Sequence, residues 1–206
     1  MLKLIVFDCD GVMFDSKKAN IEYYNSLLFN FGLAAMSREE EAYVHMASVT
    51  ESVQFIFRHY SSPSLEEVHR YRLNTDYAPF LKYMEMEADL VQFLKLVKKQ
   101  YHLAISTNRT NTMIPLLQSY ELDGYFEKVV TAATAAKPKP APDGLLEILH
   151  HFKCKPQEAI FIGDSIVDAQ QADACGVELI GFKSPELPAA HHVNCFMEIL
   201  ELAPLQ

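Results

Sequence analysis

The sequence lacks several features that would take it out of the ordinary globular class. The apolar run that starts at Leu4 ends before Asp8, too short for a signal peptide, and no later run reaches the length of a membrane span. Internal repeats and low-complexity segments are absent as well. The four cysteines form no CxxC pair and show no zinc-type spacing to histidine. We therefore expect reduced thiols in a cytoplasmic protein that neither spans nor binds a membrane.

Basic residues are in the minority. The 206 residues include 18 Lys and Arg against 27 Asp and Glu, which gives a formal net charge of −9. Such a chain repels polyanions at long range, so nucleic acid is not an expected partner. An anionic substrate would need a local positive site. The apolar fraction of 50% allows a sizeable core, in one large domain or in one domain with an insertion.

Short apolar runs alternate with helical patterns along most of the chain. The runs are rich in branched residues and end in small or polar ones, as expected for strands buried on both faces. They cover residues 4–7, 102–107, 159–162 and 177–180, with a weaker candidate at 128–131. Apolar residues recur at helical spacing between them. This alternation predicts an α/β fold with a doubly wound, Rossmann-like parallel sheet.

One segment, from residue 16 to residue 86, breaks this alternation and has only helical patterns. Ser37 and Ser64 are each followed three residues later by a glutamate, Glu40 and Glu67, which matches a capping box at the start of a helix. We therefore predict an all-helical insertion at 16–86, with 1–15 and 87–206 forming the sheet core.

Four polar clusters follow the predicted strands. Ligands of open α/β sheets bind at the carboxyl ends of the strands, so these clusters are expected to meet in one site. They are Asp8-Cys9-Asp10-Gly11, Ser106-Thr107-Asn108-Arg109, Lys137-Pro138-Lys139-Pro140, and Gly163-Asp164-Ser165 with Asp168.

The residue types in these clusters suit phosphate chemistry. Magnesium prefers hard oxygen ligands, and Asp8 and Asp164 supply two carboxylates. Lys139, Thr107 and loop amides can neutralise or hydrogen-bond phosphoryl oxygens. A carboxylate can attack phosphorus, and a second carboxyl group can protonate the leaving oxygen and then deprotonate the attacking water.

The clusters resemble, in order, the four motifs of the haloacid-dehalogenase-like (HAD) hydrolase superfamily. The likeness is greatest to the phosphoglycolate phosphatase and β-phosphoglucomutase-like branch, in which a small helical cap lies between the first and second motifs. This resemblance implies that Asp8 is the nucleophile and a magnesium ligand. Asp10 would be the general acid and base, with its backbone carbonyl also on the metal. Asp164 would bind magnesium. Asp168 would hold the metal-binding residues in place without being a ligand itself.

The resemblance also implies residues that contact the substrate. Thr107 would hydrogen-bond the phosphoryl oxygens, and Lys139 would bridge Asp8 and the phosphate. We also expect Asn108 and His45 to bind the substrate, His45 because it lies in the segment where relatives carry a substrate-specificity loop. By residue type alone, Ser106 competes with Thr107, and Lys137 competes with Lys139. The family pattern and the spacing to Asp164 favour Thr107 and Lys139. Arg109 is expected on the solvated surface.

The expected function is hydrolysis of a small phosphate monoester with magnesium, through an aspartyl-phosphate on Asp8. A phosphosugar mutase using the same intermediate is one alternative, and a non-catalytic protein that binds a phosphate ligand is another. Dehalogenation ranks low, because it typically occurs without the second aspartate and Asp10 is present. The partner would be a small phosphorylated metabolite, which the sequence does not name. The oligomeric state is not predicted.

Overall fold

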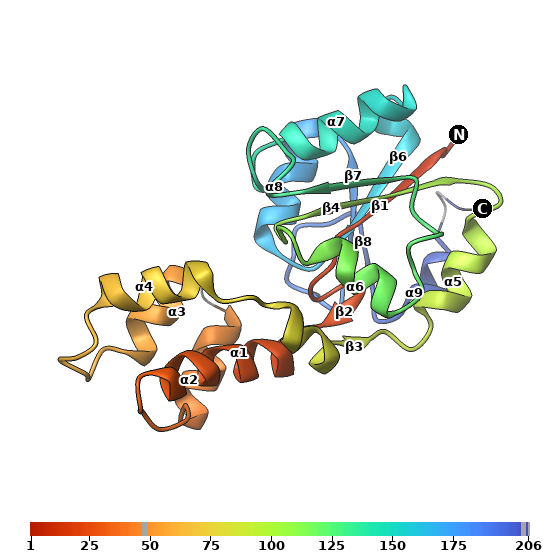
Figure 1. Cartoon of the computed structure of the whole chain (residues 1–206). Coiled ribbons are helices and arrows are strands. Elements are labelled where there is room, and N and C mark those ends of the chain that lie inside the picture. Colours follow the sequence, from red (N-terminus) through yellow and green to blue (C-terminus); the bar gives the residue numbers. More distant parts are fainter. Residues whose placement is uncertain (47–48, 203–204, 206) are drawn as a thin grey trace. The chain divides into compact units, whose positions relative to one another are not determined.

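The computed structural model describes residues 1–46, 49–202 and 205, without the side chains of residues 45 and 46. The chain divides into two compact units (Figure 1). The core unit consists of Met1–Asp15 and Glu85–Gln206, and the helical unit of Ser16–Met84. The core unit resumes at Glu85 rather than at residue 87, because strand β3 (Glu85–Met86) pairs antiparallel with β2 (Phe14–Asp15).

The core unit is built on a six-stranded parallel sheet, in the order β5-β4-β1-β6-β7-β8. Its strands are β1 (Leu4–Phe7), β4 (His102–Thr107), β5 (Lys128–Thr131), β6 (Ala159–Gly163), β7 (Glu178–Phe182) and β8 (His191–Val193). The first five were predicted, and the short edge strand β8 was not. The doubly wound α/β fold is confirmed.

Helices cover both faces of this sheet (Figure 1). Right-handed crossovers require this, because the chain first moves outward from β1 to β5 and then returns to the other side of β1. On one face, α7 (Asp143–Phe152) and α8 (Ile166–Cys175) pack on a cluster that includes Leu4 and Val6.

The opposite face carries α5 (Leu90–Val97), α6 (Met113–Ser119) and α9 (Phe196–Ile199). Phe7 of β1 points to this side, and its ring centroid lies 6.2 Å from that of Phe93 and 6.0 Å from that of Phe196. Because alternate residues of β1 enter opposite layers, the whole strand is buried between them. The short helix η2 (Pro156–Glu158) leads into β6.

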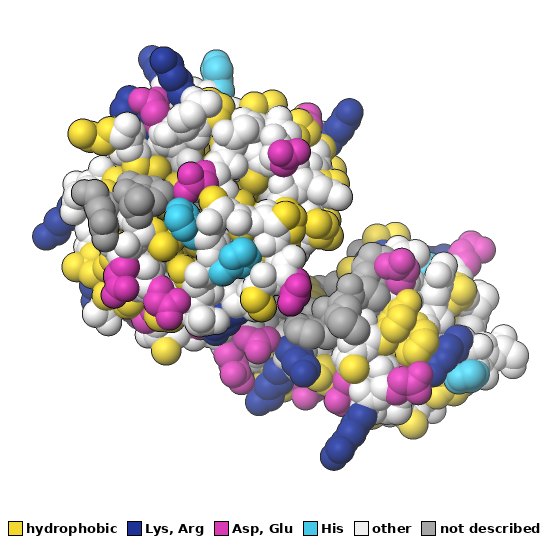
Figure 2. Space-filling model, turned by 180° about the vertical axis from the view of Figure 1, so that it is seen from behind, with side chains coloured by type: hydrophobic (Ala, Val, Ile, Leu, Met, Phe, Trp, Pro, Cys, Tyr) yellow, Lys and Arg dark blue, Asp and Glu magenta, His cyan; other side chains and the backbone are white. Residues whose placement is uncertain are grey.

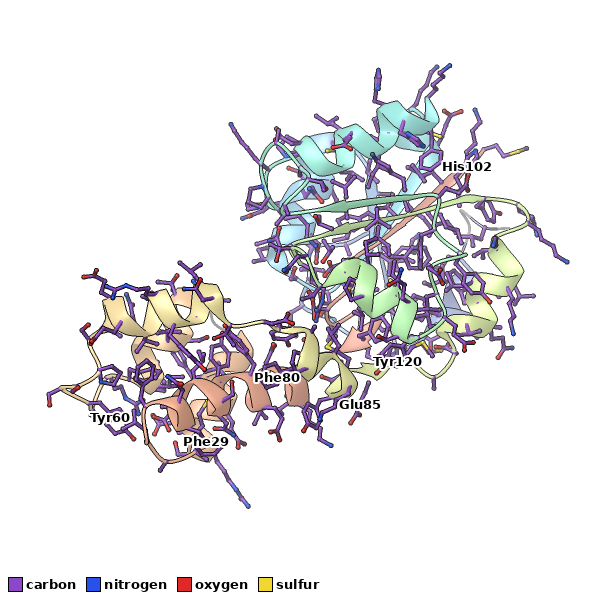
Figure 3. All side chains as sticks on the ribbon, viewed as in Figure 1. Phe29, Tyr60, Phe80, Glu85, His102 and Tyr120 are labelled. Atoms are coloured by element: carbon purple, nitrogen blue, oxygen red, sulfur yellow. The ribbon has the colours of Figure 1, made fainter. Side chains whose placement is uncertain are left out.

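The helical unit contains α1 (Lys17–Asn30), α2 (Arg38–Met46), α3 (Val49–Ile56), α4 (Leu65–Asn74) and the 3-10 helix η1 (Ala78–Tyr83). Both predicted capping boxes are present, since Glu40 and Glu67 accept from the backbone N–H of Ser37 and Ser64. Phe80 packs against the interior of this unit, whereas Phe29 and Tyr60 lie on its surface (Figure 3).

Charged side chains of both signs are interspersed on the surface of the core unit (Figure 2). Cys9, Cys154, Cys175 and Cys195 are all free thiols. Within the described part of the chain, no helix has both the length and the apolar character needed to cross a membrane.

Candidate active site

The register of the sheet brings the ends of three strands to one level. Phe7 of β1 pairs with Ile105 of β4 and with Ile162 of β6. The residues that follow are Asp8, Ser106 and Gly163, so the polar clusters after these strands start side by side. The predicted convergence at the carboxyl edge of the sheet is therefore observed for the loops that follow β1, β4 and β6.

The loop after β1 depends on a glycine. Gly11 has φ +81, in the left-handed region that L side chains rarely adopt. A Cβ atom at this position would lie 1.9 Å from Oδ2 of Asp164. Gly11 therefore allows the Asp164 carboxylate to come up against the backbone that follows Asp8 and Asp10. Asp8 itself is almost fully buried.

Lys139 reaches into the centre of the site. Its Nζ lies 2.6 Å from Oδ1 of Asp8 and 2.6 Å from Oδ1 of Asp168, and all three side chains are buried. Burial alone would lower the pKa of Lys139, but the two carboxylates outweigh it and raise the pKa, so the ammonium is charged. Lys137 is exposed, so Lys139 is the lysine that meets Asp8.

Asp168 is fully buried, and its two carboxylate oxygens accept hydrogen bonds from different parts of the site. While Oδ1 accepts from Lys139, Oδ2 accepts from the backbone N–H groups of Asp164 and Ser165 at the start of α8. Gly163 makes this possible, because a Cβ there would lie 2.5 Å from the Cβ of Asp168. Asp168 thus joins the lysine to the backbone that carries Asp164.

Three carboxylates gather around this lysine in an arrangement that fits a divalent cation. Asp8, Asp164 and Asp168 each offer an oxygen, and these oxygens lie within 4.8 Å of one another. Burial, with the nearby carboxylates, raises the pKa of Asp8 to about 8 and that of Asp164 to about 7. If all three carboxyl groups were ionised, one ammonium would not compensate their negative charge. A hard cation such as Mg2+ would compensate it, and oxygen donors are the ligands that this ion prefers.

The residues at the end of β4 have separate tasks. Ser106 is buried and donates its hydroxyl to Oε1 of Gln171 in α8, so its side chain is engaged inside the core unit. Thr107 is also buried, and its Oγ1 accepts from the backbone N–H of Arg109. Asn108, expected to contact substrate, has both ends of its amide on the backbone of Lys139, at 2.9 and 3.1 Å.

Arg109 does not lie on the solvated surface, so the expectation for this residue was wrong. Its side chain is only 8% exposed, and it donates from Nε and Nη2 to the two carboxylate oxygens of Asp10, at 2.8 and 2.7 Å. Its Nη1 donates to Oγ1 of Thr112. The signal available in the sequence was its position directly after Asn108, at the sheet edge that also carries Asp10. His45 lies in α2, and its side chain is outside the described part.

Fold and site together define a class: an α/β protein with a buried lysine and a trio of carboxylates at the carboxyl edge of a parallel sheet. Residues 5–182 match the model of the haloacid dehalogenase-like hydrolase family. The chain belongs to this family, which confirms the resemblance seen in its motifs and makes the protein a hydrolase.

A solved structure supports the assignment over the whole chain. A HAD-superfamily hydrolase of subfamily IA from Geobacter sulfurreducens is 36% identical, with a TM-score of 0.89 over 100% of this chain and 97% of that one. A crystal structure of a predicted phosphoglycolate phosphatase from Haemophilus somnus has a TM-score of 0.84 at 21% identity, covering 97% of both chains, and shows the shared fold.

Curated relatives are matched over a smaller part of their length. Phosphoglycolate phosphatase 1 of Pseudomonas aeruginosa is 28% identical over 85% of this chain and 67% of its own length. Phosphoglycolate phosphatase of Nitrosospira multiformis is 39% identical over 37% of this chain, which spans only 34% of that protein. These relatives belong to the branch indicated by the motifs.

Proposed function

We propose that this hydrolase is a magnesium-dependent phosphatase that cleaves a small phosphate monoester through an aspartyl-phosphate on Asp8, as a phosphoglycolate phosphatase-like enzyme would. The observation that supports this most directly is the pairing of Asp8 with Lys139 at 2.6 Å inside the trio of carboxylates. It joins a nucleophile, a fixed positive charge and oxygen ligands for a cation in one place.

In the proposed reaction, a carboxylate oxygen of Asp8 forms a bond to phosphorus while the ester P–O bond breaks. Asp10 gives a proton to the departing oxygen. Asp10 then takes a proton from the water that attacks phosphorus, which releases inorganic phosphate and restores Asp8. Lys139 would meet the negative charge on the phosphoryl oxygens, and Thr107 would donate its hydroxyl to one of them.

The proposed metal ligands are Asp8, Asp164 and the backbone carbonyl of Asp10. Bound Mg2+ would neutralise part of the charge on the phosphoryl group and on the carboxylates. Asp168 would not bind the metal itself but would hold Lys139 and the backbone of Asp164 in position. The presence of three carboxyl groups against one ammonium supports this assignment.

The helical unit, Ser16–Met84, is proposed to act as the cap that selects the substrate, with His45 among its contacts. The substrate would be a small phosphorylated metabolite rather than a nucleic acid, and the enzyme would work in the cytoplasm. The net charge of −9 supports the exclusion of polyanions.

The test is a panel of small phosphate monoesters, assayed for released inorganic phosphate with Mg2+ and again with a chelator. We expect release that depends on Mg2+ and is absent from Asp8→Asn protein. When the wild type reacts with a substrate that is radiolabelled in its phosphoryl group, a rapid acid quench should trap the labelled phosphoryl group on the protein. An isomerised sugar phosphate without released phosphate would instead identify a mutase. Release that persists with chelator, or in Asp8→Asn, would overturn the proposal.

A further inference from the structure

Helix α8 presents one row of side chains to the loop between β5 and α7, which carries Lys139. The row consists of Asp168, Gln171 and Cys175, spaced at i, i+3 and i+7 so that they share one face of the helix. They contact, in the same order, Nζ of Lys139, the carbonyl oxygen of Ala141 and the carbonyl oxygen of Pro142. The helix that starts at the acidic site is thus bonded along the lysine loop.

Gln171 is the member of this row with a buried, uncharged amide side chain. It is 1% exposed, and burying an amide without hydrogen bonds is unfavourable. Both ends are satisfied: Nε2 donates to the Ala141 carbonyl at 2.8 Å, and Oε1 accepts from the Ser106 hydroxyl at 2.9 Å. Ser106 is itself buried at the end of β4. One side chain therefore bonds to two segments that carry site residues.

The loop is stiff enough to transmit this restraint to Lys139. Ala141 is two residues beyond Lys139, and it stands between Pro140 and Pro142, whose rings fix their φ angles. At the other end, the amide of Asn108 holds the backbone N–H and carbonyl of Lys139. The segment that carries the lysine is thus held at two points: Asn108, after β4, bonds to the backbone of Lys139, and Gln171, on α8, bonds to the backbone of Ala141.

We propose that Gln171 is a positioning residue for Lys139: through Ala141 it sets how far the ammonium extends toward Asp8 and the phosphoryl group. Only one part of this proposal rests on the proposed function, namely that Lys139 interacts with a phosphoryl group. The geometric part, that Gln171 sets the place of Lys139 against Asp8, stands on the contacts alone. Gln171 does not touch the reacting atoms and acts through the loop.

The test compares two identical substitutions at neighbouring positions of α8. Gln171→Leu keeps the size of the side chain but removes both hydrogen bonds, whereas Gln170→Leu makes the same change on the exposed side of the helix. A displacement of about 1 Å in a catalytic group can lower a rate about 100-fold. We expect kcat/KM of Gln171→Leu to fall about 10- to 100-fold, mostly in kcat, and that of Gln170→Leu to stay near the wild-type value.

A double-mutant cycle separates positioning from a general loss of structure. If Gln171 acts through Lys139, Gln171→Leu should lower kcat/KM much less in a Lys139→Ala background than in the wild type. Equal losses in the two backgrounds would overturn the proposal. If Gln171→Leu fails to fold, Ser106→Ala, which removes only the hydroxyl that holds the amide, takes its place in the cycle with the same expected direction.

A crystal structure tests the position of Lys139 without any measurement of activity, so it does not depend on the proposed function. A crystal structure of Gln171→Leu should show the Lys139 ammonium moved from Asp8 or spread over several positions, with α8 unchanged. A lysine that keeps its 2.6 Å contact with Asp8 would overturn the proposal. If the wild type hydrolyses no phosphate ester, the proposed function fails, and the position of Lys139 in this crystal structure still decides the role of Gln171.

Discussion

Arg109 holds both carboxylate oxygens of Asp10. Nε lies 2.8 Å from Oδ2 and Nη2 lies 2.7 Å from Oδ1, so the planar guanidinium meets the planar carboxylate through two parallel hydrogen bonds. The Arg109 side chain is 8% exposed, against 37% for Asp10. In the proposed reaction, Asp10 has to give up at least one of these hydrogen bonds before it protonates a leaving group.

The first prediction concerns the energy of this pair. Asp10→Asn leaves a mostly buried guanidinium without its carboxylate, so it should lower the free energy of unfolding more than Arg109→Met, which leaves a more exposed carboxylate. We expect a coupling energy of about 1–2 kcal/mol. Urea unfolding of both single variants and the double variant measures it. Strictly additive losses would show that the two side chains do not stabilise one another.

The second prediction separates the two aspartates that follow β1. Asp8→Asn should lower phosphate release at least about 1000-fold, because it removes the nucleophile. Asp10→Asn should cost about 100- to 10,000-fold with an alkyl ester, and less with a nitrophenyl ester, whose oxygen leaves without a proton. The measurement is kcat/KM for both esters. If Asp10→Asn harms both equally, Asp10 does not protonate the leaving group.

The third prediction concerns the two lysines of the proline-rich loop. Lys139 pairs with Asp8 and Asp168, so Lys139→Ala should reduce kcat/KM about 100- to 1000-fold through lost charge stabilisation. Lys137 is exposed, and Lys137→Ala is the matched control, which should change kcat/KM little. A larger loss in Lys137→Ala than in Lys139→Ala would refute the assignment.

The fourth prediction concerns pH. The pKa of Asp8 is raised to about 8 and that of Asp164 to about 7, whereas both carboxyl groups have a pKa of about 4 in an unfolded chain. Between these values the folded protein binds more protons than the unfolded chain. The free energy of unfolding contributed by these groups therefore falls as pH rises from about 4 toward about 8.

This dependence is measurable by urea unfolding of chelator-treated protein at about pH 5.5 and about pH 8. Asp164→Asn removes one of the two carboxyl groups, so its stability should fall less between the two pH values than that of the wild type. Mg2+ should stabilise the wild type more at the higher pH, where both carboxylates are ionised. The same fall in the variant and the wild type would contradict the assignment to Asp164.

The sequence by itself determined the local elements and the edge of the sheet at which the polar clusters meet. Apolar runs and helical periodicity predicted β1, β4, β5, β6 and β7, and serine–glutamate spacing predicted two helix starts, because these signals arise between near neighbours. The clusters after the strands were expected to meet, because parallel strands end at one edge of a sheet.

Only the tertiary structure decided which side chains meet within that edge. Ser106 bonds to Gln171 in the core, and Arg109 holds Asp10. For the lysine pair, the sequence already favoured Lys139, and the structure has Lys139 in contact with Asp8. Arg109 and Asp10 are 99 positions apart in the chain. Composition and periodicity place each residue on an element, but the direction of a loop side chain depends on backbone angles and on packing against distant segments, and these are fixed only when the sheet and its helices come together.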